Sequence, residues 1–147
     1  MKLRTLCLAA AAACALPVAA FGAATAMHPE LGAKLTGKQE VPKGSPVGHG
    51  IVNVNLKAAS GKVCWTFELV GLRGAMSAHI HRAPLRKAGP IVVALGGRYK
   101  AKGCTSAPKK TIEAIESHPN AYYVNVHTAK YPNGAIRGQL VVGMVHM

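Results

Sequence analysis

The chain has 147 residues and a strongly basic composition: 18 lysines and arginines stand against 5 acidic residues, and the formal net charge is +13. All five acidic residues are glutamates, and we find neither a nucleophile motif nor a glycine-rich phosphate loop. Hydrolysis by general acid-base catalysis therefore has almost no candidate residues. A basic surface favours anionic partners such as membrane headgroups or polyanions. The lysines are scattered along the chain, however, and an ordinary solvent-exposed surface would show the same distribution.

The first 26 residues are typical of a secretory signal peptide. Lys2 and Arg4 form a charged start, residues 6–20 are apolar, and residues 24–26 offer a small-residue cleavage site, with cleavage after Ala24 fitting nearly as well. We therefore expect a periplasmic or secreted protein in which residues 27–147 form a single domain. Export argues against nucleic acid as a partner. No later apolar stretch approaches the roughly 18 residues of a membrane span, so no transmembrane segment is expected in the mature chain.

Short segments with period-two alternation recur between glycine, proline and asparagine residues, a pattern typical of antiparallel strands. In chain order, the candidate strands are residues 33–39, 52–56, 63–69, 75–82, 90–95, 122–128 and 135–142. About seven strands are too many for one flat sheet in a chain of this length. The sequence therefore predicts an all-β, antiparallel Greek-key sandwich or barrel.

One short helix is expected over residues 109–117. Ile112 and Ile115 would share its buried face, and His118-Pro119 would end it. We expect this helix to cover an open end of the sandwich.

Two cysteines remain after removal of the signal peptide, Cys64 and Cys104. An even pair in an oxidising compartment is expected to form one disulfide, which would close a loop of about 40 residues and stabilise the domain by roughly 4 kcal/mol. The alternative is two free thiols acting as soft metal ligands. It is disfavoured because neither cysteine lies near another cysteine or a histidine in the sequence.

Several phrases, taken together with their order and spacing, resemble the CHRD (chordin-type) domain. They are LTGKQEVP at residues 35–42, AHIH at 78–81, YVNVHT at 123–128, YPNG at 131–134 and IRGQL at 136–140. The resemblance covers about residues 33–142 and implies a β-sandwich module of extracellular and bacterial exported proteins, generally without an assigned activity. One departure from the family pattern is the basic segment formed by Arg82, Arg86 and Lys87.

The histidines are the best candidates for chemistry. His79 and His81 are separated by one residue, so on a strand both rings project from the same face. His127 would share an outward-facing position with Tyr123 and Asn125, which alternate with core residues. Three imidazoles on the outer face of a sandwich predict a metal site for copper, with zinc as the alternative. A hydrogen-bonded polar cluster without a metal is the other interpretation.

The order of these residues is also similar to that in copper-zinc superoxide dismutase: a His-x-His strand, a later single histidine, and an arginine near the C-terminus, here Arg137. The resemblance implies that His79, His81 and His127 are copper ligands, and that Arg137 has a catalytic role in attracting a small anion such as superoxide. Because the chain has no aspartate, a second, zinc site is not expected. Water or His49 would complete the copper site.

The direction of Arg137 depends on the turn that precedes it. A strict two-residue hairpin at Asn133-Gly134 would place Arg137 on the face opposite His127. Pro132 cannot donate to a ladder, which favours a longer loop or a bulge and leaves the direction of Arg137 open.

Three functions fit these features. The first is an exported copper-binding protein acting in superoxide chemistry, electron transfer or copper handling. The second is a non-catalytic extracellular module that binds a protein or polyanion through the sheet surface or the basic segment. The third is a structural protein of the cell envelope. His28, His49 and His146 are expected to be exposed loop or terminal residues.

Overall fold

The structure, a computed structural model, describes residues 29–147. The predicted signal peptide, its cleavage site and His28 lie outside the described residues. The strands are β1 (Glu30–Thr36), β2 (His49–Lys57), β3 (Lys62–Val70), β4 (Ala75–Arg82), β5 (Ile91–Ala94), β6 (Lys102–Ser106), β7 (Tyr122–Thr128), β8 (Ile136–Gln139) and β9 (Val141–Val142). The helices are α1 (Lys109–Ser117) and the 3-10 turns η1 (Gly37–Gln39), η2 (Ala58–Ser60) and η3 (Pro119–Ala121).

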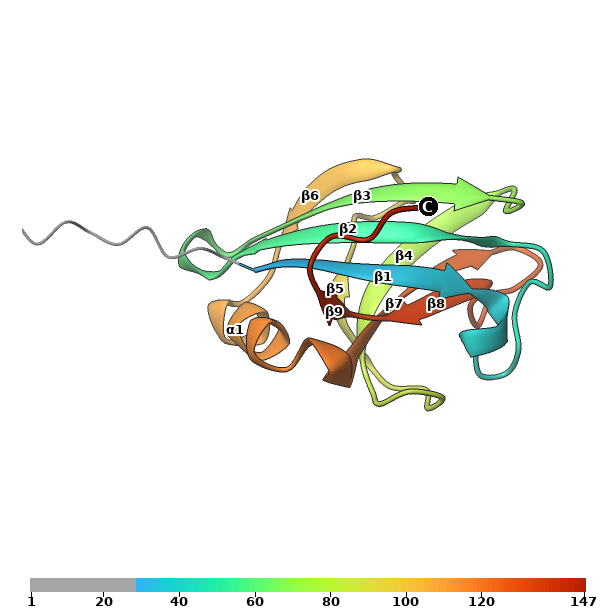
Figure 1. The fold of residues 1–147 in the computed structure, drawn as a ribbon. Coiled ribbons are helices and arrows are strands. Elements are labelled where there is room, and N and C mark those ends of the chain that lie inside the picture. The colour runs from blue at the N-terminus through green and yellow to red at the C-terminus, as the bar shows by residue number, and fades with distance from the viewer. Residues whose placement is uncertain (1–28) are drawn as a thin grey trace, which may run out of the picture.

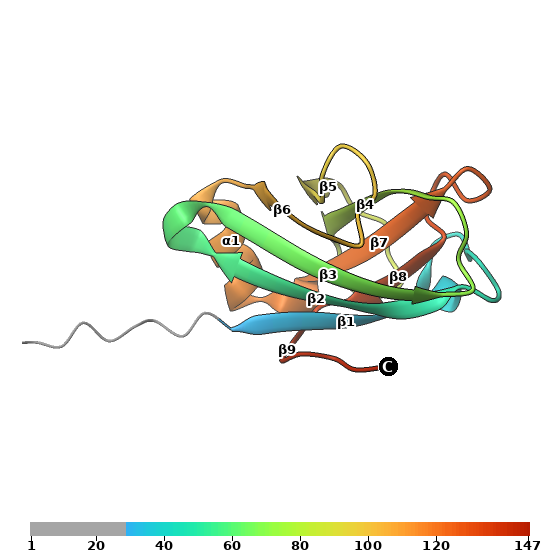
Figure 2. The same ribbon diagram turned by 90° about the horizontal axis from the view of Figure 1, so that it is seen from above.

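The strands form one curled antiparallel sheet. Its order is β5-β4-β7-β8-β1-β2-β3-β6, and β9 pairs with β1. The two halves of the sheet lie face to face, so the molecule is a nearly closed barrel (Figures 1 and 2). Residues 95–101 run from the edge strand β5 to the edge strand β6 and hydrogen-bond to both halves of the sheet. The Tyr99 amide donates to the Met76 carbonyl of β4, and the Phe67 amide of β3 donates to the Ala101 carbonyl. The predicted all-β antiparallel sandwich or barrel is confirmed.

The core lies between the two halves of the sheet. Alternate residues of β2 and β3, such as Val52, Val54 and Trp65, point into it and are almost fully buried. The predicted helix is confirmed as α1, which lies at one end of the barrel and buries Ile112 and Ile115 completely (Figure 1).

The structure adds β6 and divides one predicted strand. Lys102–Ser106 carries no large apolar residue, so hydrophobic alternation could not reveal it. Gly103 fits β6 against the core because a Cβ there would lie 2.8 Å from the Trp65 ring. The predicted strand at residues 135–142 is divided at Leu140, which is fully buried, into β8 and the short β9.

Cys64 and Cys104 form the predicted disulfide. They are direct cross-strand partners on β3 and β6. This bond fits an oxidising compartment. Among the described residues, no helix has the length and apolar character needed to cross a membrane.

Candidate metal centre

Two neighbouring strands, β4 and β7, carry the three histidines. His79 pairs with Asn125, His81 with Tyr123, and Ser77 with His127. Because cross-strand partners share a face, all three imidazoles lie on the face of the sheet turned away from the core. The alternating residues Ile80, Val124 and Val126 are fully buried in the core. The predicted common face of the histidines is confirmed.

The imidazoles converge closely enough to share one ion. One ring nitrogen from each histidine lies within 4.8 Å of those of the other two, and His79 Nδ1 is 3.1 Å from His127 Nε2. With metal–nitrogen bonds of about 2.0–2.1 Å, two nitrogens on one ion lie at most about 4.1 Å apart. Small side-chain adjustments of less than about 1 Å would therefore bring the three nitrogens to bonding distance of a common metal.

Backbone carbonyls fix the protonation of two of these rings. His81 Nδ1 donates to the Gly89 carbonyl at 2.9 Å, and His127 Nδ1 donates to the Pro132 carbonyl at 2.8 Å. A carbonyl only accepts, so each Nδ1 carries a proton, and in a neutral ring the Nε2 atom then has a lone pair. His127 Nε2 also lies 3.1 Å from both His79 Nδ1 and Asn125 Oδ1. His81 Nε2 is buried and has no hydrogen-bond partner within the described part of the chain. This arrangement is typical of metal-binding histidines, whose other nitrogen is held by a second group, and the donor set fits a metal ion.

Burial favours the neutral form of His79 and His81. The pKa of His79 is lowered to about 4, chiefly by burial and further by the neighbouring His127 and His81. The pKa of His81 is also lowered, mainly by burial. Neutral imidazole is the form that ligates a metal, so the site is ready for an ion at neutral pH.

Arg137 lies on the same face as the histidines. It pairs with Asn125 across β7 and β8, because residues 129–135 form a longer connection than a two-residue hairpin. Its guanidinium carbon lies 4.3 Å from the centroid of the Tyr123 ring, and its Nη1 donates to the Lys87 carbonyl at 2.9 Å. The side chain is only 1% exposed.

The histidine face is partly covered. Residues 83–90 lie over it: the Gly89 amide donates to the Tyr123 hydroxyl, and Gln139 Nε2 donates to the Ala83 carbonyl. Tyr123 and Asn125 are consequently buried, and His79 and His127 are only partly exposed. The prediction that Tyr123 and Asn125 lie on the face opposite the core is confirmed, and residues 83–90 bury both side chains there.

Glu40 is a buried acid near this site that sequence patterns did not single out. It is 4% exposed, and a Cβ at Gly134 would overlap its carboxylate. Burial raises the pKa of Glu40 to about 7, against the opposing effect of the Arg137 charge. Its only signal in the sequence was its place in the first CHRD-like phrase, which indicated the family rather than a role at a site.

His49 does not join the three histidines. It begins β2, and β1, β8 and β7 separate that strand from β4 in the sheet. The group of metal-ligating residues therefore consists of His79, His81 and His127 among the described residues. The Asn125 side chain also reaches this centre, with its Oδ1 3.1 Å from His127 Nε2.

These features define an antiparallel β-barrel domain with a half-buried histidine triad on its outer face. The CHRD domain family matches residues 31–140, and the chain belongs to that family. No match was found among curated proteins or among solved structures.

Proposed function

We propose that this CHRD-domain protein is exported and binds a copper ion through His79, His81 and His127. The observation that supports the proposal best is the convergence of three imidazole nitrogens within 4.8 Å. Imidazole suits both copper and zinc, but Cu(II) binds a given nitrogen site more tightly than Zn(II) does. The Cys64–Cys104 disulfide supports a periplasmic or secreted location.

The ligand set favours an open metal site over a closed structural one. Three protein ligands leave a position for an exogenous molecule, as in catalytic metal sites. Bound copper would supply one-electron redox chemistry. The protein would hold the ion through three neutral rings, and the carbonyls of Gly89 and Pro132 would orient two of them.

Arg137 is proposed to attract a small anion such as superoxide toward this site. Its positive charge lies behind the Tyr123 ring, close enough to help lower the pKa of His81. Because Arg137 is 1% exposed beneath residues 83–90, the proposal gives it a role through its electric field rather than through direct contact with the anion.

Metal analysis tests this proposal. The untagged mature protein, purified from the periplasm, is expected to contain or take up about one copper per chain and then to accelerate superoxide dismutation. The matched control is His118→Gln, which removes an exposed histidine outside the triad. A protein that stays metal-free after exposure to copper would contradict the proposed function.

A second candidate function is the binding of an anionic partner. Arg86 and Lys87 are exposed on the segment that covers the histidines, and Arg82 is exposed at the end of β4. Leu85, next to Arg86, is 56% exposed. Replacing Arg86 and Lys87 by glutamine is expected to lower the salt concentration that elutes the protein from a heparin column. Replacing Lys109 and Lys110 on α1 is the control, and equal effects from both pairs would indicate only a diffuse basic surface.

A further inference from the structure

The last residues of the described chain form a strap across the outer face of the barrel, which we define as residues 143–147. The Gly143 amide donates to the Glu30 carbonyl at 2.7 Å. The Asn53 side chain then holds Val145 from both sides: its Nδ2 donates to the Val145 carbonyl at 3.0 Å, and its Oδ1 accepts from the Val145 amide at 2.8 Å. These three hydrogen bonds hold the strap against strands β1 and β2.

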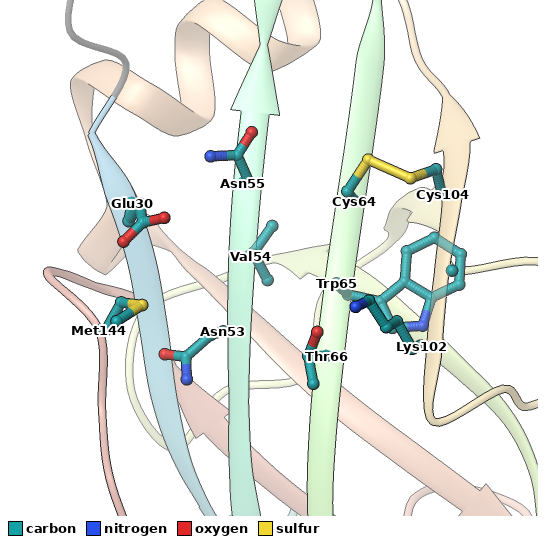
Figure 3. A pocket seen from close by; sticks show the side chains of 11 residues that line it. Glu30, Asn53, Val54, Asn55, Cys64, Trp65, Thr66, Lys102, Cys104 and Met144 are labelled. Atoms are coloured by element: carbon teal, nitrogen blue, oxygen red, sulfur yellow. A yellow bond between two sulfur atoms is a disulfide. The ribbon is translucent and has the colours of Figure 1, made fainter.

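Gly32 allows this strap to cross β1. It is the direct cross-strand partner of Asn53, and a Cβ at this position would lie 2.9 Å from both Asn53 Oδ1 and a Val145 methyl group. Figure 3 shows the Asn53 side chain extending from β2 toward the side on which Met144 lies. Because Gly32 has no side chain, the strap can lie close against the sheet.

Beyond this anchor, the strap ends over a groove of about 220 Å³ at the start of β2. His146 and Met147 of the strap line the groove together with His49 and Ile51 of β2. Ile51 is 3% exposed although it does not belong to the main hydrophobic core. Its burial indicates that the end of the strap packs on the outer face of the sheet.

His49 already has the hydrogen bond expected of a metal ligand. Its Nδ1 lies 3.1 Å from the Val47 carbonyl, which can only accept, so Nδ1 carries the proton. His49 Nε2 therefore presents a lone pair, and the carbonyl plays the orienting part that a second group plays in metal sites.

We propose that His49, His146 and Met147 form a second metal site, suited to a soft monovalent ion such as Cu(I). Two imidazoles and a thioether make a donor set that selects Cu(I) over hard cations. Lys34 also lines the groove, but it is exposed, so its ammonium group can remain in solvent while its stem lies along the groove.

This site is separate from the histidine triad. One row of cross-strand partners runs from His49 through Thr36, Arg137 and Asn125 to His79. Four strand spacings of about 4.8 Å place His49 roughly 19 Å from His79 along the sheet. The two sites therefore do not share ligands, and the second does not depend on the proposed function of the first.

Titration with Ag(I), a soft monovalent ion that needs no reductant, tests the second site while leaving the disulfide intact. In the His79→Ala background, which disables the triad, calorimetry is expected to detect about one Ag(I) per chain. Adding either Met147→Leu or His49→Gln is expected to weaken that binding at least ten-fold. The matched control is Met144→Leu, which removes a thioether from the same strap but outside this groove, and it is expected to leave the affinity unchanged.

Methyl NMR of the methionines gives an independent result. The Met147 methyl signal is expected to shift at the first equivalent of Ag(I), before that of Met144. The second site would be overturned if the Met147→Leu and His49→Gln variants both bound Ag(I) as tightly as their His79→Ala parent. A Met147 methyl signal that does not move would overturn it as well. When Met147→Leu or His49→Gln is made instead in the otherwise wild-type chain, the triad is intact, and Cu(II) binding there reports separately on the proposed function.

Discussion

The imidazole of His81 lies parallel to the ring of Tyr123, with the ring centroids 4.8 Å apart and the planes 9° from parallel. The other neighbour of that ring is Arg137. Since β7 lies between β4 and β8, Tyr123 stands between the histidine and the arginine. It therefore separates a candidate metal ligand from a buried cation while packing against both.

Tyr123→Ala is expected to lower the free energy of unfolding by about 3 kcal/mol or more, because it removes a buried aromatic ring. It should also weaken Cu(II) binding, since the His81 ring loses its packing partner. Tyr123→Phe keeps the stack and loses one hydrogen bond of 3.3 Å, at a cost of about 1 kcal/mol or less. Urea unfolding of the metal-free proteins measures both changes, and equal losses would contradict the stacking role.

Glu40 is expected to make stability fall as pH rises. Its pKa is about 7 in the folded protein against 4.5 in the reference state, so its contribution is complete below pH 4.5 and is lost as pH rises through 7. As the pH rises from 4.5 to 8, the free energy of unfolding of Glu40→Gln should increase relative to that of wild type, by up to roughly 3 kcal/mol.

The metal-free wild type alone does not isolate this effect. The pKa of His79 is lowered to about 4, so in the folded protein His79 stays neutral where the unfolded chain binds a proton. Its contribution is present above pH 6.5 and is lost as pH falls toward 4, which is the opposite trend. The difference in the free energy of unfolding between wild type and Glu40→Gln, measured with denaturant at each pH, cancels the contribution of His79. A difference that does not change with pH would contradict the raised pKa of Glu40.

Removing the disulfide is expected to destabilise the protein without removing the metal site. The bond joins β3 and β6 across a sequence separation of 40 residues, whereas the triad lies on β4 and β7. The double variant Cys64→Ala and Cys104→Ala should lose about 2–4 kcal/mol in the free energy of unfolding. At a temperature where the variant is folded, its copper stoichiometry should equal that of wild type. Loss of copper from the folded variant would instead implicate the thiols as ligands.

Arg137 gives a test of the proposed redox function. In the copper-loaded protein, Arg137→Gln is expected to slow the reaction with superoxide about ten-fold and to reduce its dependence on ionic strength, because the attracting charge is lost. Arg137→Lys, which retains the charge, should recover much of the rate. Lys87→Gln is the control, since it removes an exposed cation while keeping the backbone carbonyl that Arg137 contacts. A rate unchanged in Arg137→Gln would remove this residue from the proposal.

The alternation of β-strand residues was sufficient to predict the face on which the histidines lie. His79 and His81 had to share a side, and Val124 and Val126 had to oppose His127, because the side-chain period of a strand is two. The helix was also predictable, since Ile112 and Ile115 are spaced for one buried face.

Long-range features could not be read in the same way. The direction of Arg137 depended on the register of β7 and β8, which the loop at residues 129–135 sets. The burial of Tyr123 depends on residues 83–90 folding over the sheet, and β6 has no apolar alternation to reveal it. The position of His49 beside His146 follows from the strap, which Asn53 holds from 92 residues away in the sequence.

The most direct test of the triad is a Cu(II) titration followed by electron paramagnetic resonance, in wild type, His79→Ala and the His118→Gln control. Wild type and the control are expected to bind one Cu(II) per chain at neutral pH, with hyperfine structure from nitrogen ligands. They are expected to release it as the pH falls to about 4 and below, where His79 protonates. His79→Ala should bind at least a hundred-fold more weakly. Wild-type affinity and spectrum in His79→Ala would show that copper binds elsewhere and would contradict the three-histidine centre.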